Sequence, residues 1–120
     1  MLDCYQKKIL AYSIVFLEYY FIGNGRCELG NGSPPFRCAK TFARDISSWG
    51  CGEGYCTSYE ACIGYTYQTK VIGQEKHWCL LHTSNRRCPP GFYENNGPVA
   101  AKSSDLRASP DLNHVCYGRY

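Results

Sequence analysis

Two stretches of sequence decide the fold: CGEGYCTSYEACIGYTYQ, from Cys51 to Gln68, and HWCLLH, from His77 to His82. The first stretch places three cysteines within twelve residues, directly ahead of IGYTYQ. In IGYTYQ large side chains alternate with small or polar ones, which is the period-two pattern of a half-buried strand. A polar turn at Gln74 and Glu75 precedes the second stretch. We therefore expect a cysteine-rich loop joined to a β-hairpin whose return strand runs from Trp78 to Leu81.

The composition limits the class of protein. The chain has 120 residues, which is enough for one domain. Nine cysteines give the density of a disulfide scaffold, and such scaffolds belong to oxidising compartments. Eleven tyrosines against one methionine favour β structure over a helical bundle. We expect an extracellular protein, either secreted or at the cell surface.

Charge and hydropathy exclude two classes of partner. The formal net charge is only +3 and comes from scattered residues, so we expect no nucleic-acid partner. No apolar run reaches the roughly 18 residues that a membrane-spanning helix needs, so we expect no membrane span.

The order of the cysteines resembles the core of the PAN/apple-like domain family. The resemblance lies in Cys-x4-Cys-x5-Cys-Ile-Gly-Tyr-x-Tyr followed by a Cys-Leu-Leu strand. Upstream, GNGRC from Gly23 to Cys27 is similar to the family's first strand, and VCY at residues 115–117 resembles its closing strand. The resemblance implies an α+β, mostly β fold: a small disulfide-rich twisted antiparallel sheet with one short helix. It divides the chain into an N-terminal apolar arm, residues 1–18, and a module, residues 19–120.

The sequence departs from the family at its helix. The family carries an amphipathic helix with the first two core cysteines, but three glycines interrupt WGCGEG at residues 49–54. Each glycine costs about 1 kcal/mol in a helix interior. Phe42 and Ile46 lie at helical spacing just upstream. We therefore expect a shortened helix around Thr41 to Ser48, or an irregular loop.

The resemblance also implies a disulfide pattern. The family's nested order pairs Cys51 with Cys79, Cys56 with Cys62, and Cys27 with Cys116. Cys38 and Cys88 then remain and are paired by elimination, although eight cysteines allow 105 connectivities. The Cys27–Cys116 bond would contribute about 4 to 5 kcal/mol in the chain-entropy model. Cys4 is the ninth cysteine, and we expect it to be unpaired or bonded between chains.

Metal binding is the competing use of these residues. HxCxxH at residues 77–82 and CxxxxC at residues 51–56 contain ligand types, but they lack the usual Cys-x2-Cys spacing. In a strand, His77 and His82 would point to opposite faces. We expect no metal and no cofactor.

Catalysis has little support in the sequence. No Gly-x-Ser-x-Gly or His-Glu-x-x-His motif occurs. Glu53 and Glu60 flank Cys56 and are interpreted as solvated loop charges rather than as paired catalytic carboxylates. We expect no catalytic residue and no enzymatic activity.

Two features indicate surface recognition. Tyr65, Tyr67 and Trp78 are candidates for a binding face, because aromatic side chains give large contact area at low entropic cost. The alternative is that they belong to the core. Asn31 begins a glycosylation sequon, NGS, in a turn-rich segment, so we predict an exposed acceptor, although Pro34 behind it disfavours its use. The small and polar residues 100–114 predict a surface loop.

The N-terminal arm suggests self-association. Residues 9–22 are β-branched and aromatic, and largely precede the module. The arm lacks a small-residue cleavage site, so we expect it to belong to the folded protein. It can pack as an added strand on another copy, with the apolar residues of this assembly arm filling pockets. These residues are Ile9, Ile14, Val15, Phe16 and Leu17. The alternative is a buried helix or a first strand of the domain's own sheet.

Two functions remain open from the sequence. The resemblance implies non-enzymatic recognition of protein or carbohydrate outside the cell. Combined with the arm, this predicts a homo-oligomeric structural subunit of an extracellular filament or matrix. The alternative is a soluble adhesion module that binds a glycan or an extracellular protein.

Overall fold

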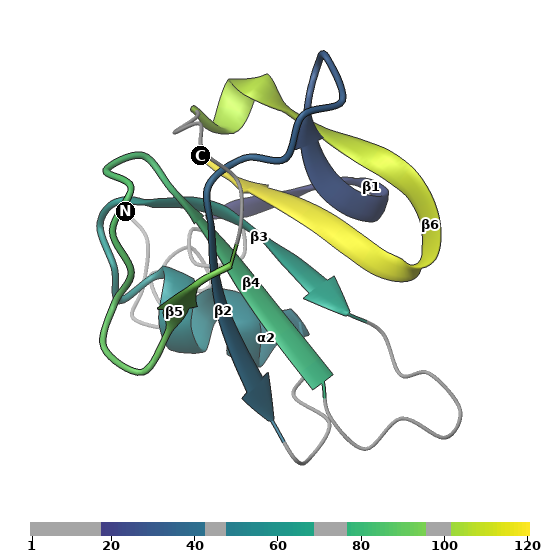
Figure 1. The fold of residues 1–120 in the computed structure, drawn as a ribbon. Helices are drawn as coiled ribbons and strands as arrows, with labels where there is room; N and C mark the ends of the chain where they lie inside the picture. The colour runs from purple at the N-terminus through teal and green to yellow at the C-terminus, as the bar shows by residue number, and fades with distance from the viewer. Residues whose placement is uncertain (1–17, 43–47, 69–76, 96–101) are drawn as a thin grey trace, which may run out of the picture.

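The computed structural model describes residues 18–42, 48–68, 77–95 and 102–120. Within these ranges six strands form a single sheet in which every neighbouring pair is antiparallel (Figure 1). Their order across the sheet is β1-β6-β3-β4-β2-β5. The strands are β1 (Tyr19–Leu29), β2 (Arg37–Phe42), β3 (Cys62–Gln68), β4 (His77–Thr83), β5 (Tyr93–Glu94) and β6 (Leu106–Arg119). The expected small, disulfide-rich, mostly β domain is therefore confirmed.

The predicted hairpin forms the centre of the sheet. β3 pairs with β4 in a register that sets Tyr65 opposite Leu81 and Tyr67 opposite Cys79. The expectation of a half-buried strand was wrong, however. Tyr65 on one face and Thr66 on the other are only 3% and 1% exposed, because the chain covers both faces of the sheet centre.

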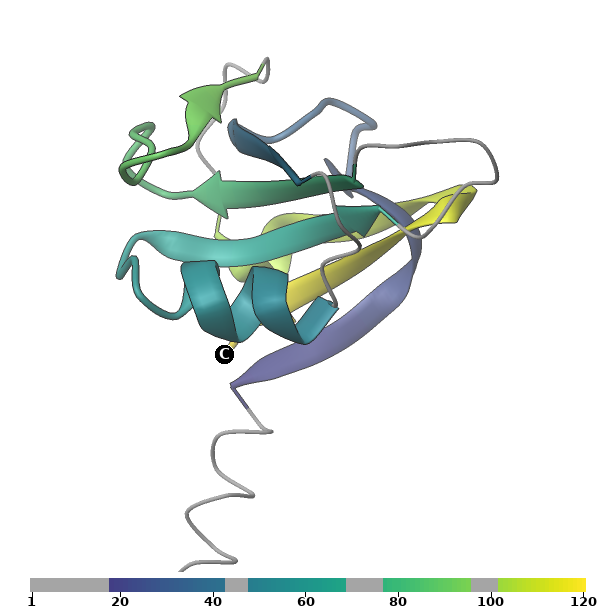
Figure 2. The ribbon, with the colours of Figure 1, turned by 90° about the horizontal axis from the view of Figure 1, so that it is seen from below.

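The described helical segment begins at Ser48. The segment α2 (Ser48–Cys51) continues into a π-helical stretch, η1 (Gly52–Cys56), and runs along one face of the sheet (Figure 2). The expected helix around Thr41 to Ser48 does not start at Thr41, because residues 37–42 form β2, and residues 43–47 lie outside the described part. The expectation that the glycines interrupt the helix was wrong, since the helical segment runs through Gly52 and Gly54.

Close packing explains why the helical segment contains a glycine at position 52. A Cβ on Gly52 would lie 2.7 Å from Cε1 of Tyr65, so only glycine lets the helical backbone approach this ring. Tertiary packing here outweighs the low helix propensity of glycine.

The last strand is longer than expected. The composition of residues 100–114 predicted a surface loop, but residues 106–114 belong to β6, which begins at Leu106. β6 pairs with β1 over most of its length, but the register shifts between Asn24 and Gly25, so residues 111–114 have no partner on β1. Gly25 has a φ of +146°, and a Cβ there would collide with the carbonyl of Ser109. β1 is strongly curved (Figure 2), and its later part lies against β3, where the N–H of Cys27 donates to Oγ1 of Thr66.

Four disulfides tie the described elements together. They are Cys27–Cys116, Cys38–Cys88, Cys51–Cys79 and Cys56–Cys62, the same pairs that the resemblance and elimination gave. Such a set indicates an oxidising environment. Cys4 lies outside the described residues.

The core has a main part on the helix side and a smaller part on the opposite face. The main part combines Tyr65, Leu81 and Phe36 with three of the disulfides. Tyr65 stacks on Tyr117 with ring centroids 5.0 Å apart, and Tyr19 meets Tyr65 edge-on at 5.2 Å. The smaller part consists of Leu106 packed around the Cys27–Cys116 bond.

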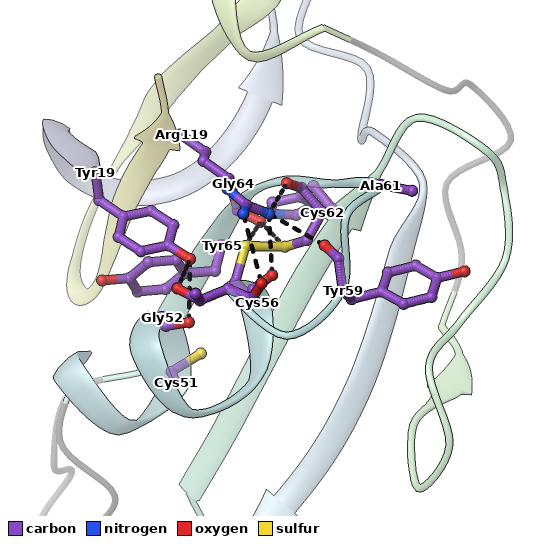
Figure 3. Close-up of a disulfide and its surroundings, with 12 residues drawn as sticks. Tyr19, Cys51, Gly52, Cys56, Tyr59, Ala61, Cys62, Gly64, Tyr65 and Arg119 are labelled. Carbon is purple, nitrogen blue, oxygen red and sulfur yellow. Dashed lines mark hydrogen bonds between the residues drawn. A yellow bond between two sulfur atoms is a disulfide. The ribbon is translucent and has the colours of Figure 1, made fainter. Parts of the chain in front are cut away.

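Arg119 closes the carbonyl end of the helical segment (Figure 3). Its Nη1 donates to the carbonyls of Cys56, Tyr59 and Cys62, each at 3.1 Å, and its Nη2 pairs with Glu18 at 3.0 Å. The carbonyls of Cys56 and Tyr59 also accept the N–H groups of Tyr59 and Cys62, so Arg119 adds a charged donor to a loop that already has backbone hydrogen bonds. The last strand therefore fixes both the helix end and the Cys56–Cys62 loop.

In the described part of the chain, no helix has the length and apolar character needed to cross a membrane.

Candidate binding pocket

The candidate site lies on the sheet face opposite the helical segment. On β4, Cys79 is bonded to Cys51 of α2, so Cys79 and Leu81 face the helix. Side chains alternate along a strand, which directs Trp78 and Leu80 to the other face.

Residues from several strands line an open pocket of about 250 Å³ on this face. Its lining residues are Arg26, Arg37, Gln68, Trp78, Leu80, Asn95 and His114. Arg26 lies on β1 and Arg37 on β2, which are not neighbours in the sheet order. The two arginines line the same pocket because the part of β1 after Gly25 lies against β3, where the N–H of Cys27 donates to Oγ1 of Thr66 at 3.0 Å.

Arg37 is held in place by Asn95. Its Nε donates to the Asn95 carbonyl at 3.1 Å, and the Asn95 N–H donates to the Arg37 carbonyl at 3.0 Å. Burial lowers the pKa of Arg37, and the positive charge of Arg26 lowers it further. The guanidinium is thus oriented, partly desolvated and close to a second positive charge.

Asp111 links the other two titratable residues of the pocket region. Its Oδ2 accepts a hydrogen bond from Nδ1 of His114 at 2.8 Å and lies 3.6 Å from Nε of Arg26. The N–H of Asn113 donates to Asp111 and lowers the pKa of its carboxyl, with His114 and Arg26 acting in the same direction. Burial lowers the pKa of His114, and Asp111 opposes this shift. A neutral His114 therefore carries its proton on Nδ1.

Below the pocket, on the same face of the sheet, Thr66 and His82 form a buried network in which each polar group has a hydrogen-bond partner. Oγ1 of Thr66 lies 2.8 Å from Nε2 of His82, whose Nδ1 lies 3.2 Å from the carbonyl of Phe36. Because a carbonyl only accepts, Nδ1 must carry the proton, and Thr66 then donates to Nε2. Burial lowers the pKa of His82 to about 4, so the ring is neutral at pH 7. This network holds β3, β4 and the bent part of β1 together beneath the pocket.

The pocket has the groups of a recognition site. Its lining combines two arginines and two amide residues with a tryptophan, and so provides hydrogen-bonding groups together with an apolar surface. Among the described residues, no three histidine, cysteine or carboxylate side chains gather as metal ligands. The eight described cysteines are all in disulfides.

The aromatic residues proposed from the sequence do not form one face. Tyr65 and Tyr67 pack on the helix side in the main core, because they share a face with the disulfide-bonded cysteines. Trp78 points to the opposite face and lines the pocket. The grouping of these three residues as a single binding face was therefore wrong, and only Trp78 remains in the candidate site.

The other candidates from the sequence are placed as follows. Asn31 is exposed beside a turn, and its Oδ1 accepts the N–H of Ser33 at 3.0 Å. Glu53 accepts a hydrogen bond from Thr57 at 3.3 Å, and Glu60 is exposed. The side chain of His77 and the five residues of the assembly arm lie outside the described part of the structure.

Six of the seven pocket residues were not singled out from the sequence: Arg26, Arg37, Gln68, Leu80, Asn95 and His114. They are spread over most of the chain and share no local motif. The available hint was the Gly23-Asn24-Gly25 sequence, because closely spaced glycines allow a strand to bend.

Comparison of the chain with family models, curated proteins and solved structures gave no match.

Proposed function

We propose that this chain is a non-enzymatic extracellular binding module whose pocket beside Trp78 binds carbohydrate. The observation that carries this proposal is the indole of Trp78 in a pocket with Gln68, Asn95 and two arginines. The resemblance to PAN/apple-like domains supports it, since that resemblance implies recognition of protein or carbohydrate.

The chemistry of the pocket suits a sugar ring. A pyranose has one largely apolar face of C–H groups, which packs on an indole, and hydroxyls around its rim, which need hydrogen-bond partners. Amide side chains both donate and accept, so Gln68 and Asn95 can match hydroxyls in either role. The volume of about 250 Å³ is below that of drug-sized pockets, which suits one sugar residue at the end of a glycan.

The scaffold supports binding by a preformed site. Arg37 is fixed by Asn95, and the floor is fixed by the hydrogen bonds of Thr66 and His82. A ligand entering such a site loses less free energy to the ordering of protein side chains.

The test is a glycan array followed by calorimetric titration of the best ligand. Trp78→Ala is expected to weaken binding at least tenfold, because it removes the stacking surface. Tyr120→Ala is the matched control, since Tyr120 is the aromatic residue with 76% exposure at the end of the chain and does not line the pocket. Binding that survives Trp78→Ala unchanged would contradict the proposed site.

A further inference from the structure

We infer that this pocket selects sugars that carry an acidic group, a carboxylate or a sulfate ester, and that Arg37 and Arg26 hold that group. The inference rests on the proposed carbohydrate site and names its class of ligand.

The charges that line the pocket are of one sign. Its lining includes two arginines and no carboxylate. The nearby Asp111 is engaged by His114 at 2.8 Å, and its distance of 3.6 Å from Nε of Arg26 is too long for a strong hydrogen bond. With His114 neutral, the positive charges of Arg26 and Arg37 are only partly compensated by the single carboxylate of Asp111. Such an excess favours an anionic ligand group.

Arg37 lines the pocket with a guanidinium that is aligned by the protein. Its Nε is used by the carbonyl of Asn95, which aligns the guanidinium. The edge formed by Nη1 and Nη2 is the one that donates two parallel hydrogen bonds to a carboxylate or sulfate. A fixed guanidinium makes these bonds at a lower entropic cost than a mobile one.

Arg26 supplies the second contact. Its side chain is 57% exposed, so it can turn toward a ligand without losing much hydration. An acidic group between the two guanidiniums would also relieve the repulsion that lowers the pKa of Arg37. A neutral sugar cannot reduce the repulsion between the two guanidiniums. The acid should therefore bind at least tenfold more tightly than the neutral sugar with the same ring.

The experiment compares matched sugars by calorimetric titration with the full chain. Methyl glucuronide is compared with methyl glucoside, and methyl galacturonide with methyl galactoside. A sulfate ester of each neutral glycoside separates carboxylate from sulfate recognition, and inorganic sulfate tests the anion alone. Each titration is repeated in Arg37→Gln, Arg26→Gln and the control Arg107→Gln. Arg107 is exposed on β6 and donates to the carbonyls of Ser104 and Leu106, outside the pocket.

The expected result is an acidic sugar bound at least tenfold more tightly than its neutral partner. That preference should disappear in Arg37→Gln, decrease in Arg26→Gln and persist in Arg107→Gln. Arg37→Lys provides a second test should Arg37→Gln not fold, because lysine keeps the charge but cannot donate the parallel pair of bonds. It should reduce the preference for the acidic sugar over its neutral partner, because the positive charge alone does not supply the two parallel hydrogen bonds.

The contrary results separate this inference from the proposed function. Equal affinity for acidic and neutral sugars, lost in Trp78→Ala, would overturn the inference and leave the carbohydrate site standing. Two results would overturn both proposals. In the first, inorganic sulfate binds but no sugar shows binding that depends on Trp78. In the second, none of the probes binds.

Discussion

The hydroxyl of Thr66 donates to Nε2 of His82 across 2.8 Å, although the two side chains are only 1% and 0% exposed. Both side chains lie on the pocket face of the two central strands. A buried polar pair of this kind is stable only because every donor and acceptor is matched, here by the N–H of Cys27 and the carbonyl of Phe36. Protonation of His82 would break that match, since Nε2 would become a second donor.

The fold should therefore lose stability in mild acid. The pKa of His82 falls from its ordinary 6.5 to about 4 in the folded protein, so the unfolded chain takes up the proton first as the pH drops. Stability is fully present above pH 6.5 and is lost between pH 6.5 and 4, by on the order of 3 kcal/mol. Burial is the main cause of this shift, and the positive charge of Arg37 lowers the pKa of His82 further. Denaturant unfolding at a series of pH values measures the effect.

A substitution assigns this pH dependence to its source. His82→Gln should be less stable at pH 7, but its free energy of unfolding should fall much less in acid than that of the wild-type chain. In His114→Gln the fall should be reduced to a smaller extent, because burial also lowers the pKa of His114. A decline of the same size in His82→Gln and the wild-type chain would contradict this account.

The glycines of the helical segment should respond in opposite ways. Gly52→Ala places a methyl group 2.7 Å from the ring of Tyr65 and should destabilise the fold by about 1 to 3 kcal/mol through overpacking. Gly54→Ala meets nothing within 4 Å and should leave stability unchanged or raise it by up to about 1 kcal/mol. Thermal unfolding of both variants under oxidising conditions decides the matter, and a loss in Gly54→Ala as large as in Gly52→Ala would refute the packing argument.

Removal of the Arg119 side chain should loosen the helix end. Arg119→Ala leaves the carbonyls of Cys56, Tyr59 and Cys62 without their shared donor and should cost about 2 to 4 kcal/mol. Hydrogen exchange should rise in residues 56–62 more than in β4. Arg107→Ala, which removes an exposed arginine from the same strand, should change stability by no more than about 0.5 kcal/mol. Equal effects of the two substitutions would show that Arg119 has no special role.

The N-terminal arm stays a prediction, because residues 1–17 lie outside the described part of the structure. Deletion of these residues should convert a self-associated chain into a monomer that keeps the fold and the sugar affinity of the full chain. Sedimentation of the two chains, with reducing and non-reducing gels to follow Cys4, measures this. A full-length chain that is already monomeric would end the hypothesis of assembly through the arm.

The central hairpin could be predicted from sequence because its information is local. Alternation from Ile63 to Gln68 specifies a strand without reference to the rest of the chain. The helix could not be placed in this way, since Gly52 owes its position to the ring of Tyr65, which a propensity scale does not include. Residues 106–114 look like a loop because their strand conformation depends on pairing with β1 and β3 rather than on their own side chains.

The pocket was the least predictable part. Trp78 could be singled out as an aromatic residue, but its face could be decided only after Cys79 was known to bond to Cys51. Arg26 and Arg37 come together through the bend of β1, a property of the backbone at Gly25 that no residue spacing encodes.

The Cys27–Cys116 bond also determines how the module responds to force. The N–H of Tyr120 donates to the carbonyl of Glu18 at 2.9 Å, so both ends of the described module lie side by side. Tension applied there would peel β1 from β6 one pair at a time, starting at Tyr19 and Arg119, until it reached the disulfide. The covalent bond would then carry the load, and the chain between its two cysteines would feel none of it. That shielded loop contains the other three disulfides and every pocket residue except Arg26.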